Sequence, residues 1–114
     1  MPTSTLETTI QSSLNEHKAV NIICLDVKKA TSITDFMFFC SATSTRHAQA
    51  LADYLSDEVR AAHQGYSKPN IQGSDDAEWI VVDFSDAIIH IMQPHTRDYY
   101  QLEKLWHSYL NQHS

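Results

Sequence analysis

The chain has 114 residues, which is enough for one domain with a modest core. Hydrophobic residues at 42% and charged residues at 19% are typical of a globular chain and exclude a disordered one. Fourteen acidic and eight basic residues give a net charge of −6, which argues against a general nucleic-acid binder. Polar residues interrupt every apolar run and no signal peptide is visible, so we expect a cytoplasmic protein without a membrane segment.

The first part of the chain predicts a helix followed by two strands. A capping-box spacing between Ser4 and Glu7 precedes apolar residues that recur every four positions, which predicts a helix over residues 4–18. Residues 21–27 are rich in β-branched side chains and predict a strand. Residues 34–41 form a nearly continuous apolar run, which is typical of a strand buried on both faces.

A longer helix and a loop come next. Small and aliphatic residues at helical spacing predict a helix that ends near Gly65: Ala48, Leu51, Ala52, Leu55, Val59 and Ala62. Residues 65–78 contain both glycines, a proline and three acids. We therefore expect a loop there, with a short edge strand around Ile71.

The rest of the chain predicts a β-hairpin and a last helix. Strands at 79–83 and 86–92 leave only residues 84–85 between them, which is hairpin spacing. After Pro94 we expect one helix to about residue 112. Its apolar stripe would consist of Tyr99, Leu102, Trp106 and Leu110. The order α-β-β-α-β-β-α predicts an α/β fold, a single domain over residues 1–114 with a mixed β-sheet flanked by helices.

Motifs for catalysis and metal binding are missing from the sequence. It contains no GxGxxG, P-loop, GxSxG or HExxH pattern. The seven histidines are scattered, and we expect them to be solvated rather than to bind a metal. Cys24 and Cys40 lie in separate apolar runs and are interpreted as buried and unpaired. We therefore predict no catalytic residue, no metal and no cofactor.

One face of the predicted hairpin is uniformly apolar and the other is mixed. With the turn at Phe84-Ser85, Asp83 would lie opposite Asp86, and Trp79 opposite His90. Opposed carboxylates destabilise a sheet, and a metal ion or a basic partner would relieve the repulsion. Hydration of both aspartates at the hairpin tip is the alternative, and the pairing alone leaves these explanations open.

The distribution of charge favours a partner. Residues 75–106 contain seven acidic and two basic residues, whereas residues 1–74 contain seven acidic and six basic residues. An acidic surface with exposed aromatic side chains is typical of a docking site for a basic protein. Tyr100 lies off the apolar stripe of the last helix, so we expect it to be exposed. The predicted partner-binding residues are Trp79, Asp83, Asp86, His90, Tyr100 and Glu103.

Two residues at the start of the second helix are predicted to be structural. Arg46 and His47 follow the polar turn after the second strand. We expect them to lie near the carboxylate of Asp35, within reach of a hydrogen bond, and to support the fold rather than a partner.

Three blocks of sequence resemble the ribosomal silencing factor family, also called Iojap. They are residues 32–47, with SITDF and CSATSTRH, residues 76–93, with AEWIVVD and DAIIHIMQ, and residues 97–106, with RDYY and LEKLW. The resemblance covers residues 4–106 in the family's order, and residues 107–114 extend past its usual end. Ala42 and Ser85 stand where the family has glycines, which bears on turn geometry.

The resemblance implies a specific function. Members of this family bind the large ribosomal subunit through ribosomal protein number fourteen of the L series. They obstruct joining of the small subunit and repress translation when nutrients are short. The family fold is similar to that of nucleotidyltransferases without the catalytic motif. A non-enzyme is therefore expected, with little direct contact with nucleic acid.

Two alternatives belong to other classes. The first is a metal-dependent nucleotidyltransferase-like enzyme that uses Asp83 and Asp86, although the sequence lacks a glycine-rich phosphate-binding loop. The second is a homodimer in which the mixed face pairs with itself. Such a dimer and a ribosome-bound form would compete for one surface.

Overall fold

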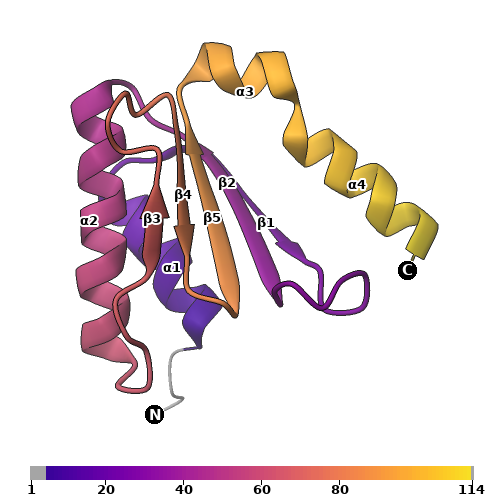
Figure 1. The fold of residues 1–114 in the computed structure, drawn as a ribbon, viewed down its shortest axis with the longest axis horizontal. Helices are drawn as coiled ribbons and strands as arrows, with labels where there is room; N and C mark the ends of the chain where they lie inside the picture. Colours follow the sequence, from indigo (N-terminus) through magenta and orange to yellow (C-terminus); the bar gives the residue numbers. More distant parts are fainter. Residues whose placement is uncertain (1–4, 114) are drawn as a thin grey trace.

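Five strands form one sheet that carries helices on both faces, as seen in a computed structural model that describes residues 5–113 (Figure 1). The helices are α1 (Leu6–Glu16), α2 (Thr45–Ala62), α3 (Pro94–Tyr100) and α4 (Leu102–His113). The strands are β1 (Val20–Asp26), β2 (Phe36–Ser41), β3 (Asn70–Gln72), β4 (Trp79–Asp83) and β5 (Ala87–Met92). The predicted α/β class and mixed sheet are confirmed, including the short edge strand at Ile71.

The position of β2 inside the sheet explains its continuous apolar run. The sheet order is β1-β2-β5-β4-β3, in which β2 and β5 are parallel and the other neighbours are antiparallel. Phe38 and Phe39 point to opposite faces of β2, and both are 0% exposed. A strand that contributes side chains to two cores must be apolar at nearly every position.

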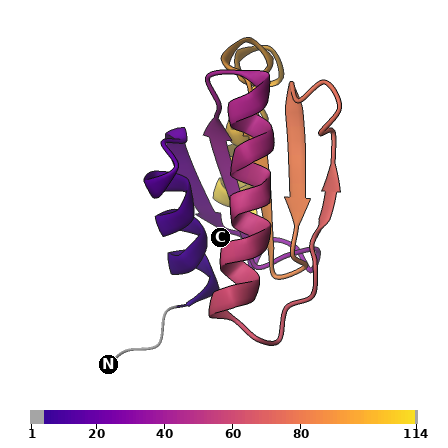
Figure 2. The ribbon, with the colours of Figure 1, turned by 90° about the vertical axis from the view of Figure 1, so that its left-hand side faces the viewer.

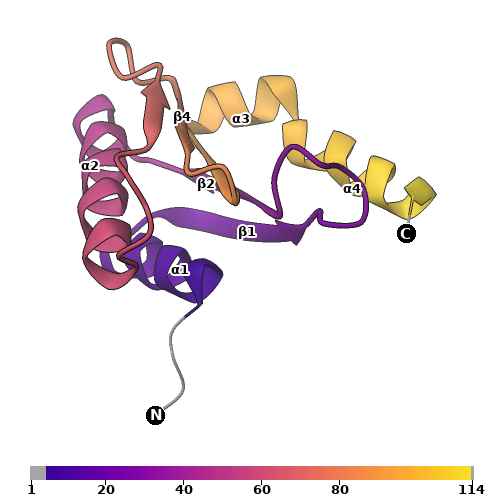
Figure 3. The same cartoon turned by 60° about the horizontal axis from the view of Figure 1, so that its bottom comes forward.

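Each face of the sheet has its own core. On the first face, α1 and α2 lie side by side and bury Leu14 and Leu55 against the sheet (Figure 2). On the second face, α4 packs Leu102, Trp106 and Leu110 against a smaller cluster that includes Phe39 and Met92. Figure 3 shows α4 beside the loop between β1 and β2, where the Tyr109 hydroxyl donates to the Ala30 carbonyl at 3.1 Å.

The prediction of one final helix is wrong. Gln101 adopts a left-handed conformation (φ 47°, ψ 42°) that ends α3, and α4 begins at the next residue. The break turns the chain, so Leu102 and Trp106 face the sheet while Tyr99 is 81% exposed. The predicted apolar stripe therefore holds for α4 and fails for Tyr99.

Two expectations near the N-terminus also change. Ser4, the predicted first residue of a capping box, lies outside the described residues, and Thr5 is the N-cap of α1. The Thr5 hydroxyl accepts a hydrogen bond from the Thr8 backbone N–H at 3.2 Å. Both cysteines are free, but only Cys40 is buried; Cys24 is exposed on β1. The prediction of burial is therefore wrong for Cys24.

The predicted pairing of the hairpin is wrong by two residues. Trp79 lies opposite Met92, and His90 lies opposite Val81. The turn residues are Ser85 and Asp86, because buried Phe84 closes the hairpin by donating its N–H to the Ala87 carbonyl at 2.9 Å. A shift of two residues keeps every side chain on its predicted face. Asp83 lies opposite Ile88, so the proposed repulsive pair with Asp86 does not exist.

Ser85→Gly should stabilise the protein. Ser85 has a φ of 74°, in the left-handed region where a side chain costs about 1 kcal/mol and glycine costs little. We expect the free energy of unfolding to rise by about 0.5–1 kcal/mol, measured by urea denaturation. Ser108→Gly, an exposed site within α4, should lower stability by a similar amount. A loss of stability for Ser85→Gly would contradict the strain argument.

Candidate partner-binding surface

An aromatic column runs from the second core to the surface. Its members are Phe39, His90, Trp79, Tyr100 and Tyr99. The Phe39 and His90 rings stack at 5.1 Å, and Trp79 lies 5.9 Å from His90. Trp79 and Tyr100 are 5.0 Å apart, and Tyr100 and Tyr99 are 4.9 Å apart. Tyr100 is 51% exposed, so the sheet supports aromatic rings that end in solvent.

His90 orients the Trp79 side chain through a hydrogen bond. The indole Nε1–H of Trp79 donates to Nδ1 of His90 at 3.0 Å, which leaves the imidazole proton on Nε2. His90 is only 8% exposed, and burial lowers its pKa from 6.5 to about 4. His90 was predicted to touch the partner directly. The structure instead places it beneath Trp79, where it fixes the indole that reaches the surface.

Stability should fall on acidification because of His90. The unfolded state binds a proton below pH 6.5, whereas the folded state resists it down to about pH 4, so the contribution present above pH 6.5 is lost between these values. The loss reaches at most about 1.4 kcal/mol per pH unit. His90→Gln keeps an acceptor for the Trp79 N–H and removes this dependence. Urea denaturation at pH 7 and pH 5 measures the change in the free energy of unfolding between the two pH values. An equal change in the wild type and in His90→Gln would contradict the role of His90.

Glu103 forms an internal ion pair with Arg97. The Arg97 Nε and Nη2 groups donate to the two carboxylate oxygens of Glu103 at 2.6 and 3.1 Å. Arg97 also donates to the Ser41 hydroxyl at 3.0 Å and to the Val20 carbonyl at 3.4 Å, and it is 8% exposed. Glu103 was predicted to face a basic partner, but both of its oxygens are taken by Arg97. It therefore fastens α4 to α3 and β2.

The role of Arg97 was missed in the sequence. It is the only lysine or arginine between residues 69 and 103, and it lies within the acidic segment of residues 75–106. A lone base among acids is a signal for an internal ion pair, because burial of a charge requires a partner of opposite sign.

Asp83 and Asp86 each have a separate hydrogen bond. The Asp83 carboxylate accepts the Ser85 N–H at 2.8 Å and shapes the turn. The Asp86 carboxylate accepts the Tyr66 hydroxyl at 2.6 Å. Burial and this contact raise the pKa of Tyr66 to about 12. Asp86 is exposed and Asp83 is half-buried, so their charges stay close to solvent at the hairpin tip.

The predicted contact of Arg46 and His47 with Asp35 is wrong. Asp35 precedes β2 and the two residues follow it, so a strand of about 20 Å separates them. His47 accepts the Thr43 N–H at its Nδ1 (3.0 Å) and donates from Nε2 to the His17 carbonyl (2.9 Å). It thus connects the start of α2 to the end of α1. Arg46 is exposed, and its side chain has no hydrogen bond among the described residues.

Other acidic side chains remain exposed near the aromatic column. Glu78 immediately precedes Trp79 and lies 3.4 Å from His95. Asp98 precedes Tyr99 on α3. The surface therefore combines exposed tyrosine rings with carboxylates, the composition expected of a site for a basic protein. Among the described helices, none has the length and apolar character to cross a membrane.

Comparison with known proteins shows the family to which the chain belongs. The family model "Ribosomal silencing factor during starvation" matches residues 2–114. The chain is a member of the ribosomal silencing factor family. The Ribosomal silencing factor RsfS of Haemophilus influenzae is 43% identical over 97 residues, which cover 85% of this chain and 93% of that protein. The Protein Iojap, chloroplastic of Zea mays is 27% identical and covers 85% of this chain and 41% of that protein.

Relatives also include an organellar protein and solved structures. The mouse "Mitochondrial assembly of ribosomal large subunit protein 1" is 38% identical and covers 83% of this chain and 42% of that protein. A crystal structure of a Chromobacterium violaceum protein superposes with a TM-score of 0.83 at 31% identity, over 93% of this chain and 87% of that chain. Translation regulation and association with ribosomes follow from membership of the ribosomal silencing factor family.

The nucleotidyltransferase alternative is not favoured. Among the described residues, neither Asp83 nor Asp86 belongs to a group of three or more side chains able to hold a metal ion together. Each carboxylate is instead held by its own hydrogen bond.

Proposed function

We propose that this protein binds the large ribosomal subunit, blocks joining of the small subunit and represses translation under nutrient limitation. The proposed contact is ribosomal protein number fourteen of the L series, a basic protein. The proposal rests on membership of the ribosomal silencing factor family. The name of the mouse relative, which refers to assembly of the ribosomal large subunit, also supports the proposal.

The surface that would carry this contact is the exposed end of the aromatic column with its neighbouring carboxylates. Trp79 and Tyr100 supply rigid apolar area, and Glu78 beside them supplies charge for basic groups. Asp83 and Asp86 lie at the hairpin tip, at the other end of β4, and would extend the acidic surface there. The Trp79–His90 hydrogen bond holds the indole in place before the partner arrives, which lowers the entropy lost on binding. The proposed mechanism is steric exclusion of the small subunit, which needs no catalytic residue.

Co-sedimentation with purified subunits tests the proposal. We expect the protein to pellet with large subunits and not with small subunits, and to reduce the yield of joined ribosomes in a mixing experiment. The protein is proposed to act in the cytoplasm, where bacterial ribosomes work, without a cofactor. Pelleting with neither subunit would reject the proposed function.

The free protein is proposed to form a homodimer through the same face. Tyr99 and Leu105 are 81% and 64% exposed, and a second copy would cover such apolar area. Analytical ultracentrifugation should then show a dimer that dissociates when large subunits are added. A monomer at all concentrations would reject the dimer and leave the proposed ribosome binding unaffected.

A further inference from the structure

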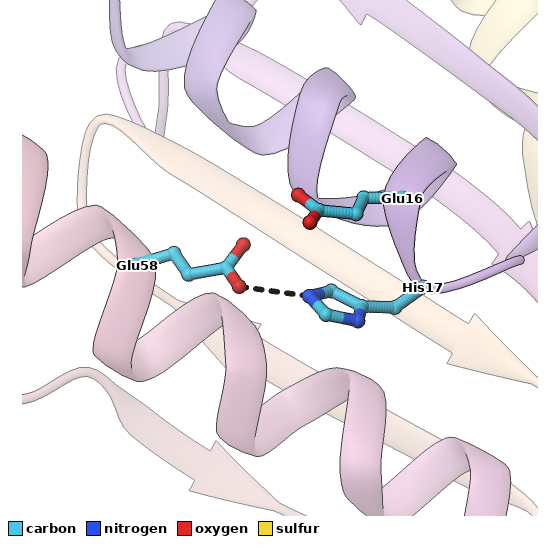
Figure 4. Close-up of side chains that lie close together, drawn as sticks. All are labelled: Glu16, His17 and Glu58. Carbon is cyan, nitrogen blue, oxygen red and sulfur yellow. Dashed lines mark hydrogen bonds and ion pairs between the residues drawn. The ribbon is translucent and has the colours of Figure 1, made fainter.

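Three potential metal ligands meet where the end of α1 packs against α2, far from the aromatic column. They are Glu16, His17 and Glu58, whose ligand atoms all lie within 4.8 Å of one another (Figure 4). Nε2 of His17 lies 2.8 Å from the Glu58 carboxylate. Figure 4 shows the Glu16 carboxylate near both groups, so one imidazole and two carboxylates point toward a common centre.

The His17 ring is held in place before any ligand binds. Its face stacks on Tyr54 at 3.6 Å with an interplanar angle of 1°. The His17 carbonyl accepts a hydrogen bond from the His47 Nε2–H at 2.9 Å, which fixes the backbone that carries the ring. The His17 side chain is 19% exposed and that of Glu58 35%, so the centre is partly shielded yet accessible from solvent. Such preorganisation is what an engineered or natural metal site requires.

The three side chains are not balanced in charge. Two carboxylates meet one imidazole, and no lysine or arginine forms an ion pair with Glu16 or Glu58 among the described residues. The Glu16 side chain makes no hydrogen bond there. A divalent cation would neutralise both carboxylates and give Glu16 a partner.

A buried hydroxyl beside the centre also lacks a partner. Ser13 is 3% exposed, and its Oγ has no hydrogen bond in the described part of the chain. The Ser13 hydroxyl lies beside the Glu58 carboxylate. If the Glu58 carboxylate turned from His17 to a metal ion, the Ser13 hydroxyl could donate to its second oxygen. Metal-bound carboxylates commonly have such a support.

We infer that Glu16, His17 and Glu58 form a binding site for a divalent transition-metal ion of the zinc type, with Ser13 supporting the Glu58 ligand. One imidazole nitrogen and two carboxylate oxygens suit zinc, and water would complete the coordination. Zinc would bind Nε2 of His17 in the imidazole tautomer that carries its proton on Nδ1. Because the ligands come from two helices, the ion would fasten α1 to α2.

Zinc binding to the full chain tests the inference. Calorimetry should detect one equivalent of zinc, and the melting temperature should rise by about 10 °C at a zinc concentration of 100 times Kd. Magnesium should cause no such rise, because it prefers oxygen ligands and binds imidazole poorly. Absence of any zinc-dependent shift in the wild-type protein would overturn the site.

Glu16→Gln is the decisive variant. Glu16 has no partner in the metal-free structure, so the substitution should leave the metal-free melting temperature unchanged while zinc affinity falls about tenfold or more. Glu78→Gln is the matched control, since Glu78 also lies beside a histidine, His95 at 3.4 Å, but without a third ligand. It should bind zinc like the wild type. Wild-type affinity in Glu16→Gln, or an equal loss in Glu78→Gln, would reject the assignment.

Discussion

Arg97→Ala should lower the free energy of unfolding by about 3–5 kcal/mol, the cost of leaving a buried charge without its partner. Arg97 is 8% exposed and donates to Glu103, the Ser41 hydroxyl and the Val20 carbonyl. The substitution strands the Glu103 carboxylate beside β2 and removes the bonds that join α3 to the sheet. Urea denaturation followed by circular dichroism measures the loss, which corresponds to roughly 10–20 °C in melting temperature.

A matched pair of variants separates burial from charge. Arg60 pairs with Asp57 at 3.3 Å on the surface of α2, so Arg60→Ala should cost less than about 1 kcal/mol. The double variant Arg97→Met, Glu103→Leu removes both charges and should be more stable than Arg97→Ala alone. If Arg97→Ala costs no more than Arg60→Ala, the ion pair does not fasten α3 and α4 to the sheet.

Patterns of hydrophobicity predicted the faces of the sheet but not the pairing of its hairpin. Alternation in β4 and β5 placed Trp79, Asp83 and His90 on one face, and this holds because a two-residue shift preserves the side-chain period. The pairing depends on the turn, and Phe84 was taken for a turn residue. Its aromatic ring gains more from burial against Tyr66 than from a turn position, so the turn moved to Ser85 and Asp86.

Two aromatic residues of the candidate surface were named from the sequence, whereas Tyr99 and the residues that support the surface were not. Trp79 was predicted because it lies on the mixed face of the hairpin, and Tyr100 because it lies off the apolar stripe of the last helix. The supports depend on contacts between residues far apart in the chain, such as Arg97 with Ser41. The helix break at Gln101, a residue without a strong preference for the left-handed region, carries no local signal. Such features follow from tertiary packing.

Tyr100→Ala should weaken binding to the large ribosomal subunit by about thirtyfold, or about 2 kcal/mol, with little change in stability. Tyr100 is 51% exposed and packs on Trp79 at 5.0 Å, so a partner that covers it would bury a ring already held in place. Truncation exposes the edge of Trp79 and removes that contact area. Co-sedimentation with large subunits over a range of protein concentrations measures the affinity, and a melting curve checks the fold.

Tyr54→Ala provides the control for this prediction. Tyr54 is 44% exposed, but it lies on α2, which covers the opposite face of the sheet. Its loss should leave subunit affinity unchanged, because the proposed interface lies on the face that carries the aromatic column. The affinity of the wild-type protein for large subunits should also fall as the salt concentration rises, because the surface presents carboxylates to a basic partner. Equal affinities for Tyr100→Ala and the wild type would move the interface away from the aromatic column, even if the protein still pellets with large subunits.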